Sequence, residues 1–134
     1  MGLKEKRSKN LLESFKHAFE GLGFALKTVS NLKIHLLFTL VVILGGFFFR
    51  IQPYEWLVCL IFIALVISLE LVNTAIEEAV NLSTLEINIR AKHAKDVAAG
   101  AVLFSAIISF IVGCIIFLPK VVDFIGGLLW KINY

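Results

Sequence analysis

Three long stretches of the chain carry no charged residue, and a shorter amphipathic stretch precedes them. The uncharged stretches run from Leu36 to Phe49, from Trp56 to Leu69 and from Val97 to Leu118. With their apolar flanks they approach or exceed the roughly 20 residues that a helix needs to cross a bilayer. The pattern therefore predicts three membrane-spanning helices. We place them at residues 32–51, 54–80 and 91–118.

The amphipathic stretch before the first span has helical spacing. Its apolar residues recur at steps of three and four, and they are Leu11, Leu12, Phe15, Ala18, Phe19, Leu22, Leu26 and Val29. This spacing places them on one face of a helix that is too short and too polar to span a membrane. Residues 10–29 are thus predicted to lie along the membrane surface, with Asn10 as the cap and Glu13 three residues on. Residues 1–9 form a basic leader.

Prolines mark the outer ends of the second and third predicted spans. Pro53 suits the first position of a helix, and residues 50–56 form a tight turn in which Trp56 suits the membrane interface. Pro119 is expected to end the helix of the third span, because proline interrupts a helix. Residues 119–134 are then a weakly amphipathic tail at the outer interface, and the whole chain, 1–134, is one membrane domain.

Composition agrees with an all-α membrane protein. The chain is 59% hydrophobic and 17% charged, whereas a soluble domain has about a quarter of its residues charged. The net charge of +3 is too small and too scattered to indicate a nucleic-acid partner. Ten of the 13 basic residues lie before the first uncharged stretch or between the second and third. Because cytoplasmic loops are enriched in lysine and arginine, this distribution predicts a cytoplasmic N-terminus and a cytoplasmic second loop.

The cysteines and histidines do not form a recognisable metal or redox motif. Cys59 and Cys114 lie in apolar stretches near the predicted outer ends, where a disulfide is conceivable. We expect both to be small apolar packing residues instead. We likewise expect His35 and His93 to be polar residues at the interface and not ligands.

A stripe of polar residues lies on the second predicted span near its cytoplasmic end. At about 100° per residue, Glu70, Asn73, Glu77 and Asn81 share one side of the helix. Ionised groups are costly in a bilayer, so such a stripe is expected to face a protein interior, a cavity or the membrane rim.

The start of the third span brings further charges to the same rim. Lys95 and Asp96 lie there, so oxygen ligands suited to Mg²⁺ stand beside a cation able to neutralise a phosphoryl group. The set fits phosphoryl transfer from a soluble nucleotide to an acceptor in the membrane, but it equally fits a structural ion-pair network or an ion pathway. Because the chain has no GxxxxGK[ST] loop, a kinase of this kind must hold phosphates through metal and side chains.

Two segments resemble a known family. The sequence Glu70-Leu-Val-Asn73-Thr-Ala-Ile-Glu77, with Ala94-Lys95-Asp96-Val-Ala-Ala-Gly-Ala-Val102, is similar to the prokaryotic diacylglycerol kinases, which include undecaprenol kinases. Residues 14–21 and 31–35 also resemble family segments. The resemblance implies a homotrimer, each subunit with three spans and a surface helix, in the bacterial cell membrane. It implies phosphorylation of a lipid alcohol by ATP with Mg²⁺, undecaprenol being favoured over diacylglycerol. The active sites would be shared between subunits at the cytoplasmic face.

The resemblance also assigns roles to residues. Glu70 would be the catalytic base that takes the lipid hydroxyl proton, and Glu77 would hold the metal bound to ATP with support from Asn73. The nucleotide-binding residues would be His17, Asn73, Glu77, Glu86, Lys95 and Asp96. The lipid-binding residues would be Glu70, Trp56 and Ala99, of which Ala99 leaves room for the headgroup.

This sequence departs from the family pattern at three positions. Val29 stands where a metal-binding glutamate is usual, Asn81 where an aspartate is usual, and His17 where a tyrosine is common. Loss of a carboxylate from such a ligand set typically costs about one to two orders of magnitude in metal affinity or activity. A catalytically silent homologue that binds nucleotide or lipid, or has a structural role, is therefore the alternative. A proton- or ion-conducting oligomer ranks last, because no polar residue continues the stripe into the outer half of the second span.

Overall fold

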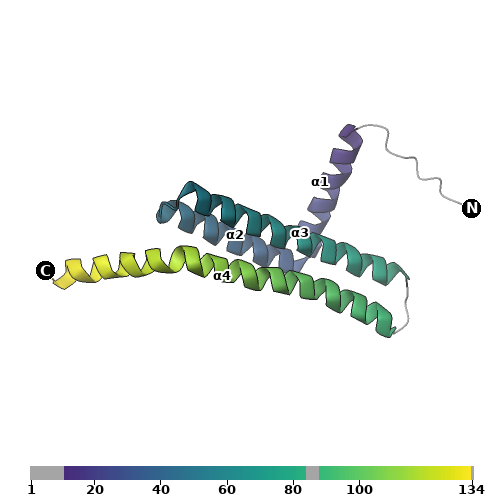
Figure 1. The fold of residues 1–134 in the computed structure, drawn as a ribbon. Helices are drawn as coiled ribbons and strands as arrows, with labels where there is room; N and C mark the ends of the chain where they lie inside the picture. The colour runs from purple at the N-terminus through teal and green to yellow at the C-terminus, as the bar shows by residue number, and fades with distance from the viewer. Residues whose placement is uncertain (1–10, 84–87, 134) are drawn as a thin grey trace, which may run out of the picture.

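The computed structural model describes residues 11–83 and 88–133, which form four helices. They are α1 (Leu11–Thr28), α2 (Ser30–Phe48), α3 (Pro53–Ser83) and α4 (Ile89–Asn133). The helices α2, α3 and α4 lie side by side, and α1 leaves them at a steep angle (Figure 1). Each of those three is long and apolar enough to cross a membrane. The predicted all-α fold with three spans is confirmed.

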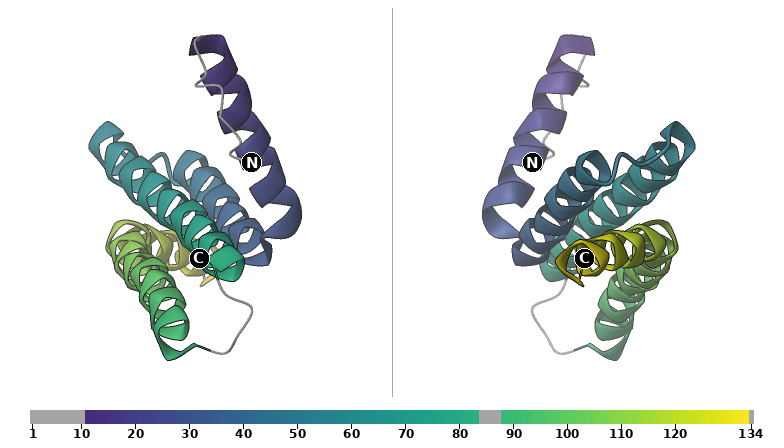
Figure 2. Two further views of the ribbon diagram at one scale, coloured as in Figure 1. Left: turned by 90° about the vertical axis from the view of Figure 1, so that its right-hand side faces the viewer. Right: turned by 90° about the vertical axis from the view of Figure 1, so that its left-hand side faces the viewer.

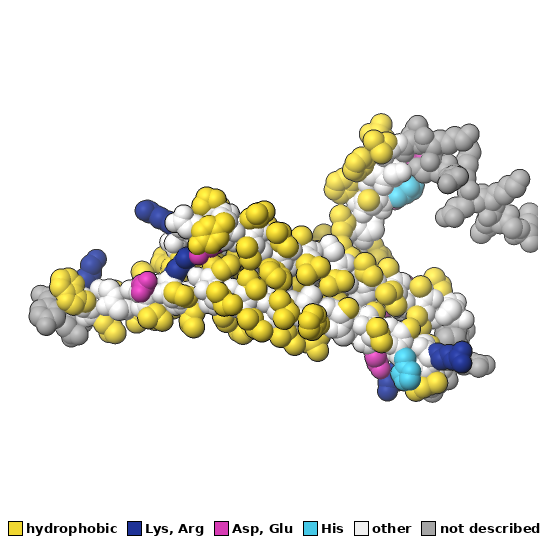
Figure 3. Space-filling view, in the orientation of Figure 1, with side chains coloured by type: hydrophobic (Ala, Val, Ile, Leu, Met, Phe, Trp, Pro, Cys, Tyr) yellow, Lys and Arg dark blue, Asp and Glu magenta, His cyan; other side chains and the backbone are white. Residues whose placement is uncertain are grey.

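The surface of the bundle is apolar along the three spans. Yellow apolar side chains cover the middle of the molecule, while charged side chains gather towards its ends (Figure 3). Large residues such as Phe38, Leu44 and Phe110 are more than half exposed. The fully buried positions are few, and α3 packs most extensively against α4. Such a surface is stable in lipid and not in water.

Helix α1 is almost fully exposed and carries the predicted apolar stripe. Leu11 is 76% exposed and Phe19 is 70% exposed, whereas Ala25, near the end of α1, is buried. A single extended residue, Val29 (φ −93°, ψ 108°), separates α1 from α2. This break turns α1 across the direction of the spans (Figure 1). The proposed cap Asn10 and the basic leader lie outside the described residues.

The turn between α2 and α3 is closed by a regular helix-ending motif. Arg50 has a left-handed backbone conformation (φ 51°), and the N–H groups of Arg50 and Ile51 donate to the carbonyls of Phe47 (3.3 Å) and Gly46 (3.1 Å). This is the Schellman pattern, in which the chain satisfies the last free carbonyls of a helix. Ile51 is then buried against the first turns of α3, so the turn sets how α2 and α3 pack.

The expectation that Pro119 ends the helix is wrong, because α4 continues through it to Asn133. Proline removes one helical hydrogen bond, but membrane helices tolerate it when neighbouring groups hold the helix. Here the contacts come from both other spans. Lys120 donates to the carboxylate of Glu55 on α3 at 2.8 Å, and the ring of Phe124 lies 5.4 Å from that of Phe48 on α2.

The small buried core lies at this same end of the bundle. It contains Ile51, Cys59 and Ile116, with aromatic rings packed around it. Both cysteines are free, and Cys59 is buried while Cys114 is exposed. Cys59 thus packs in this core as expected, whereas Cys114 does not, and the structure has no disulfide between the two.

Candidate functional site

The polar stripe on α3 is buried where it meets the rest of the bundle. Glu70 is only 2% exposed and Asn73 is 6% exposed. Helical spacing places both on the side of α3 that faces α2 and α4, while Glu77 follows one turn later and is half-buried. Glu70 has no ion-pair partner in the part of the chain that the structure describes. Burial of a carboxylate without a cation costs free energy, so its presence indicates a function more strongly than an exposed acid does.

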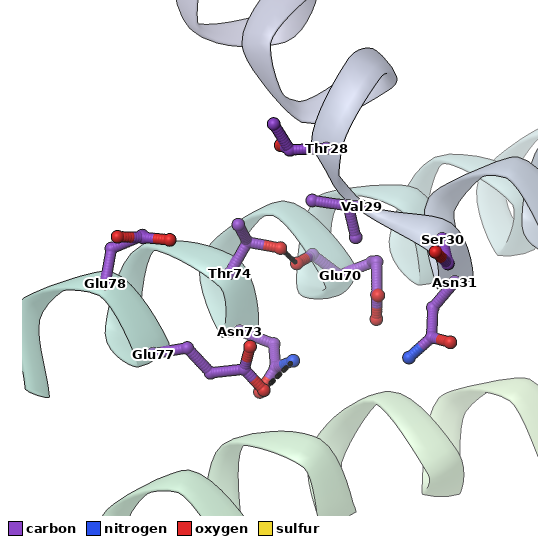
Figure 4. Close-up of a pocket in the computed structure, with 9 residues that line it drawn as sticks. All are labelled: Thr28, Val29, Ser30, Asn31, Glu70, Asn73, Thr74, Glu77 and Glu78. Carbon is purple, nitrogen blue, oxygen red and sulfur yellow. Dashed lines mark hydrogen bonds between the residues drawn. The ribbon is translucent and has the colours of Figure 1, made fainter. Parts of the chain in front are cut away.

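The junction between α1 and α2 covers this stripe and encloses a polar pocket of about 260 Å³. Side chains from the junction and from α3 face one another across it (Figure 4). The lining residues are Thr28, Val29, Ser30, Asn31, Glu70, Asn73, Thr74, Glu77 and Glu78. The single extended residue at Val29 is what brings the junction over α3.

The hydrogen bonds inside this polar pocket leave the side-chain oxygen of Asn73 available to a ligand. The side-chain amide of Asn73 donates to the carboxylate of Glu77 at 3.3 Å (Figure 4). Its own oxygen is buried and has no hydrogen-bond partner among the described residues. Buried polar atoms without partners are rare in native structures and often mark a site for an ion, water or ligand. Thr74 is occupied locally, because its hydroxyl donates to the backbone carbonyl of Glu70 at 2.9 Å.

A second, more apolar pocket of about 260 Å³ adjoins the first on the side of α4. It is lined by Asn31, Ile34, His35, Glu70, Asn73, Ala99, Val102, Leu103 and Ala106. The two pockets share Asn31, Glu70 and Asn73. One polar and one apolar pocket thus meet at the buried carboxylate of Glu70.

The donor atoms in the polar pocket fit Mg²⁺ bound to a nucleotide. The pocket offers carboxylates and the free amide oxygen of Asn73, all of which are hard oxygen ligands. Among the described residues, no group of three acidic, histidine or cysteine side chains could hold a metal ion by itself. Mg²⁺ usually takes only one or two protein carboxylates and completes its shell with water and phosphate. The residues present therefore fit the metal as part of a metal–nucleotide complex.

Asn81 contacts α4 and does not line the polar pocket, although its position in the stripe suggested a place beside Glu77. Its side-chain oxygen accepts a hydrogen bond from Lys95 at 2.6 Å, which links the end of α3 to the start of α4. Neither described pocket is lined by Asn81, Lys95 or Asp96, and Asp96 is exposed. The structure thus brings Lys95 to α3 through Asn81, one turn beyond Glu77, instead of placing it over Glu70.

Of three other predicted site residues, two lie far from the two pockets and one is not among the described residues. His17 is exposed on α1 and pairs with Glu20 at 3.2 Å, about 17 Å along the helix from Thr28. Trp56 lies at the start of α3, about 21 Å along the helix from Glu70, where its ring packs 5.1 Å from that of Phe47. Glu86 lies outside the described residues. Ala99, by contrast, lines the apolar pocket together with Glu70.

Sequence reasoning missed the contribution of the α1–α2 junction. Thr28, Ser30 and Asn31 line the polar pocket, and His35, which we expected only at the interface, lines the apolar one. A run of small polar residues between two apolar helices was the available signal. It is a weak one, because the same residues are common wherever a helix ends or begins.

Comparison with known proteins decides the family. Residues 16–117 match the family described as prokaryotic diacylglycerol kinase. The chain belongs to this family. The match covers α2, α3 and most of α1, and on α4 it ends just before Pro119.

Two relatives show the same affiliation. The chain is 43% identical over 108 residues to undecaprenol kinase from Bacillus subtilis, covering 81% of this chain and 88% of the relative. It is 38% identical over 115 residues to diacylglycerol kinase from Synechocystis sp., covering 85% of this chain and 66% of the relative. The family and both relatives are lipid kinases, so this chain is a lipid kinase, a transferase with three membrane-spanning helices.

Proposed function

We propose that the protein transfers the γ-phosphate of ATP to undecaprenol at the cytoplasmic face of the bacterial cell membrane. The observation that carries the proposal is the position of Glu70. Its buried carboxylate forms part of the wall between a polar pocket, suited to phosphates and a cation, and an apolar pocket that opens among the spans. A water-soluble donor and a lipid acceptor must meet at such a boundary.

In the proposed reaction Glu70 is the general base. The lipid hydroxyl occupies the apolar pocket near Ala99, and the Glu70 carboxylate takes its proton as the hydroxyl oxygen attacks the γ-phosphorus. The bond from the γ-phosphorus to the bridging oxygen breaks, and ADP leaves with that oxygen. Burial keeps water from competing as the acceptor, because Glu70 is only 2% exposed.

Glu77, with support from the free oxygen of Asn73, would hold Mg²⁺. When bound, Mg²⁺ neutralises charge on the β- and γ-phosphates. Lys95 would contact the nucleotide from the start of α4, held towards α3 by its hydrogen bond to Asn81. His17, Glu86 and Asp96 belong to the proposed nucleotide contacts on the family resemblance alone.

A homotrimer with shared active sites is part of the proposal. The acidic residues that line the polar pocket are all on α3, and Val29 contributes no oxygen from the opposite wall. A neighbouring copy is a source of the charged groups that one chain lacks in this pocket. The cytoplasmic orientation is supported by the sequence, in which ten of the 13 basic residues lie before the first uncharged stretch or between the second and third. The two pockets lie at the corresponding ends of α2, α3 and α4.

Undecaprenol is favoured over diacylglycerol because the undecaprenol kinase relative is the more similar of the two. The test uses purified protein in micelles with labelled ATP and each lipid alcohol. We expect a phosphorylated product from undecaprenol at a clearly higher kcat/KM than from diacylglycerol. Glu70→Gln is expected to lower kcat by about 10²–10⁴-fold, the usual contribution of a general base. Glu13→Gln, which removes an exposed carboxylate on α1, is the control and should leave the rate unchanged.

A catalytically silent homologue is the second candidate, and Val29 favours it. This side chain lines the polar pocket without any atom that could bind a metal. If neither alcohol yields a product at any Mg²⁺ concentration, the kinase proposal fails and Val29→Glu should create activity from a near-zero start. If the wild-type protein is already active, Val29→Glu is expected to change its Mg²⁺ dependence and to have less effect on kcat.

A further inference from the structure

The last part of α4, Val121–Lys131, has no counterpart in the matched family segment, which ends at residue 117. We call it the tail helix. It extends beyond the turn between α2 and α3, so no other described helix covers its final turns (Figure 1). Apart from Val121, its large apolar side chains are about half exposed or more, from 49% at Ile125 to 68% at Trp130.

The apolar side chains of the tail helix are confined to one side. At 100° per residue an arc of about 160° contains only apolar positions. These are Val121, Val122, Phe124, Ile125, Leu128 and Leu129. The opposite side carries Asp123, Gly126, Gly127 and Lys131, with Trp130 among them. This is the composition of a helix that lies in a membrane interface, where tryptophan and lysine are enriched.

The tail helix starts at the outer boundary of the membrane. The uncharged stretch from Val97 to Leu118 has 22 residues and measures about 33 Å, enough to cross a hydrocarbon layer of about 30 Å. Lys120 follows at once and pairs with Glu55 at 2.8 Å, and two charged groups at the same level mark the edge of the apolar layer. A straight continuation would carry Trp130 about 15 Å past Lys120 into water.

Pro119 allows a change of direction at this boundary. Having no N–H, it cannot donate to the carbonyl of Ile115, and most sharp bends in helices occur at such positions. Viewed from the ends of the bundle, the yellow final turns of α4 no longer follow the line of its green first part (Figure 2). The ring of Phe124 lies 5.4 Å and 6.2 Å from those of Phe48 and Phe49, so the first turn of the tail helix packs over the end of α2.

We propose that the tail helix is an interfacial anchor that turns at Pro119 and lies with its apolar side in the outer leaflet of the same membrane. The apolar side continues the lipid-facing surface of the spans, and its occupant is therefore lipid. The anchor does not depend on the kinase reaction, because the tail helix lies at the end of the bundle opposite the two pockets.

A tryptophan placed on the apolar side reports directly on the position of the tail helix, whereas Trp130 itself lies on the opposite side. The experiment measures tryptophan emission of the full chain in vesicles made from lipids brominated either near the headgroup or near the chain end. The difference between the double variant Leu129→Trp with Trp130→Phe and the single variant Trp130→Phe gives the signal of the tryptophan at position 129. We expect emission that is blue-shifted from that of tryptophan in water. Because interfacial helices lie only about 5–10 Å deep, we expect the shallow bromines to quench at least about twofold more strongly than the deep ones.

A pair of double variants tests whether the apolar side causes the binding. Ile125→Glu with Leu128→Glu places two charges on the apolar side and should abolish the blue shift and the quenching by lipid. Gly126→Glu with Gly127→Glu places the same two charges on the polar side, where an added Cβ meets no atom within 4 Å. This control should keep both signals.

Three results would overturn the proposal. Quenching only from water of the tryptophan introduced by Leu129→Trp would mean that the tail helix projects from the membrane. Stronger quenching by the deep bromines would mean that it continues the span. If the blue shift disappears when the protein is diluted in lipid, a second copy of the chain covers the apolar side.

Discussion

At the scale of single residues, Asn81 shows that a side chain's role depends on its neighbour as much as on its place in a motif. Its position on the polar stripe suggested a part in the metal site, yet its oxygen accepts from Lys95 at 2.6 Å. A neutral amide holds the lysine without cancelling its charge. Lys95 therefore keeps a full positive charge for a phosphate group, which an aspartate at this position would partly neutralise.

Asn81→Asp should weaken nucleotide binding and leave the chemical step alone. Because an exposed ion pair contributes about 0.2–1 kcal/mol, the KM for ATP should rise by no more than about fivefold while kcat is unchanged. The effect should shrink at high salt. Asn88→Asp makes the same charge change at a helix cap, where Asn88 accepts from the N–H of Arg90 at 2.8 Å, and it should leave KM unchanged. An increase of kcat in Asn81→Asp would instead show that residue 81 belongs to the metal site.

At the scale of the helices, the turn between α2 and α3 depends on the close approach of Gly46 to Trp56. A Cβ built on Gly46 would lie 2.6 Å from the ring of Trp56, whereas real Cβ atoms keep a much greater distance. The glycine thus lets the end of α2 pack against the first turn of α3. Of the two adjacent glycines in the sequence, Gly46 is the one that requires the absence of a side chain, since a Cβ at Gly45 would meet only the edge of the Phe117 ring at 3.3 Å.

Gly46→Ala is expected to lower the free energy of unfolding by about 1–3 kcal/mol, the usual cost of overpacking. The measurement is thermal or denaturant unfolding in detergent micelles, followed by circular dichroism. Gly21→Ala is the control, because a Cβ there meets nothing within 4 Å. Since alanine favours a helix by up to about 1 kcal/mol over glycine, this control should be neutral or stabilising. Equal losses in both variants would contradict the role of Trp56.

At the scale of the whole molecule, a buried ion pair joins residues far apart in the sequence. Glu55 has 10% of its side chain exposed and accepts from Lys120 at 2.8 Å and from the backbone N–H of Gln52 at 2.7 Å. The pair connects the start of α3 to α4 directly after Pro119. It joins α3 and α4 at one end of the bundle, while the two pockets occupy the other end.

Removing one partner of this pair should destabilise the fold. Glu55→Ala is expected to lower the free energy of unfolding by about 1–3 kcal/mol, because Lys120 loses a charged hydrogen-bond partner at a partly buried position. A double-mutant cycle with Lys120→Ala should give a coupling of about 0.5–3 kcal/mol. Asp123→Ala, which removes an exposed acid close by, should change stability by no more than about 0.5 kcal/mol. Additive losses in the cycle would mean that the two residues act independently.

The sequence by itself determined the three long apolar helices, the amphipathic helix before them and the stripe from Glu70 to Glu77. These are local properties, because hydropathy over about 20 residues and the 3.6-residue period do not depend on what packs against a helix. For the same reason two motifs on the second and third spans were enough to indicate the family.

Only the tertiary structure decided which side chains meet. The extended residue Val29 brings Ser30 and Asn31 over Glu70, and this depends on the direction in which α1 leaves α2. Lys120 pairs with Glu55, so α4 continues through Pro119 against the local preference of proline. In both places contacts between distant segments outweigh local propensity, and such contacts have no periodic signal in the sequence.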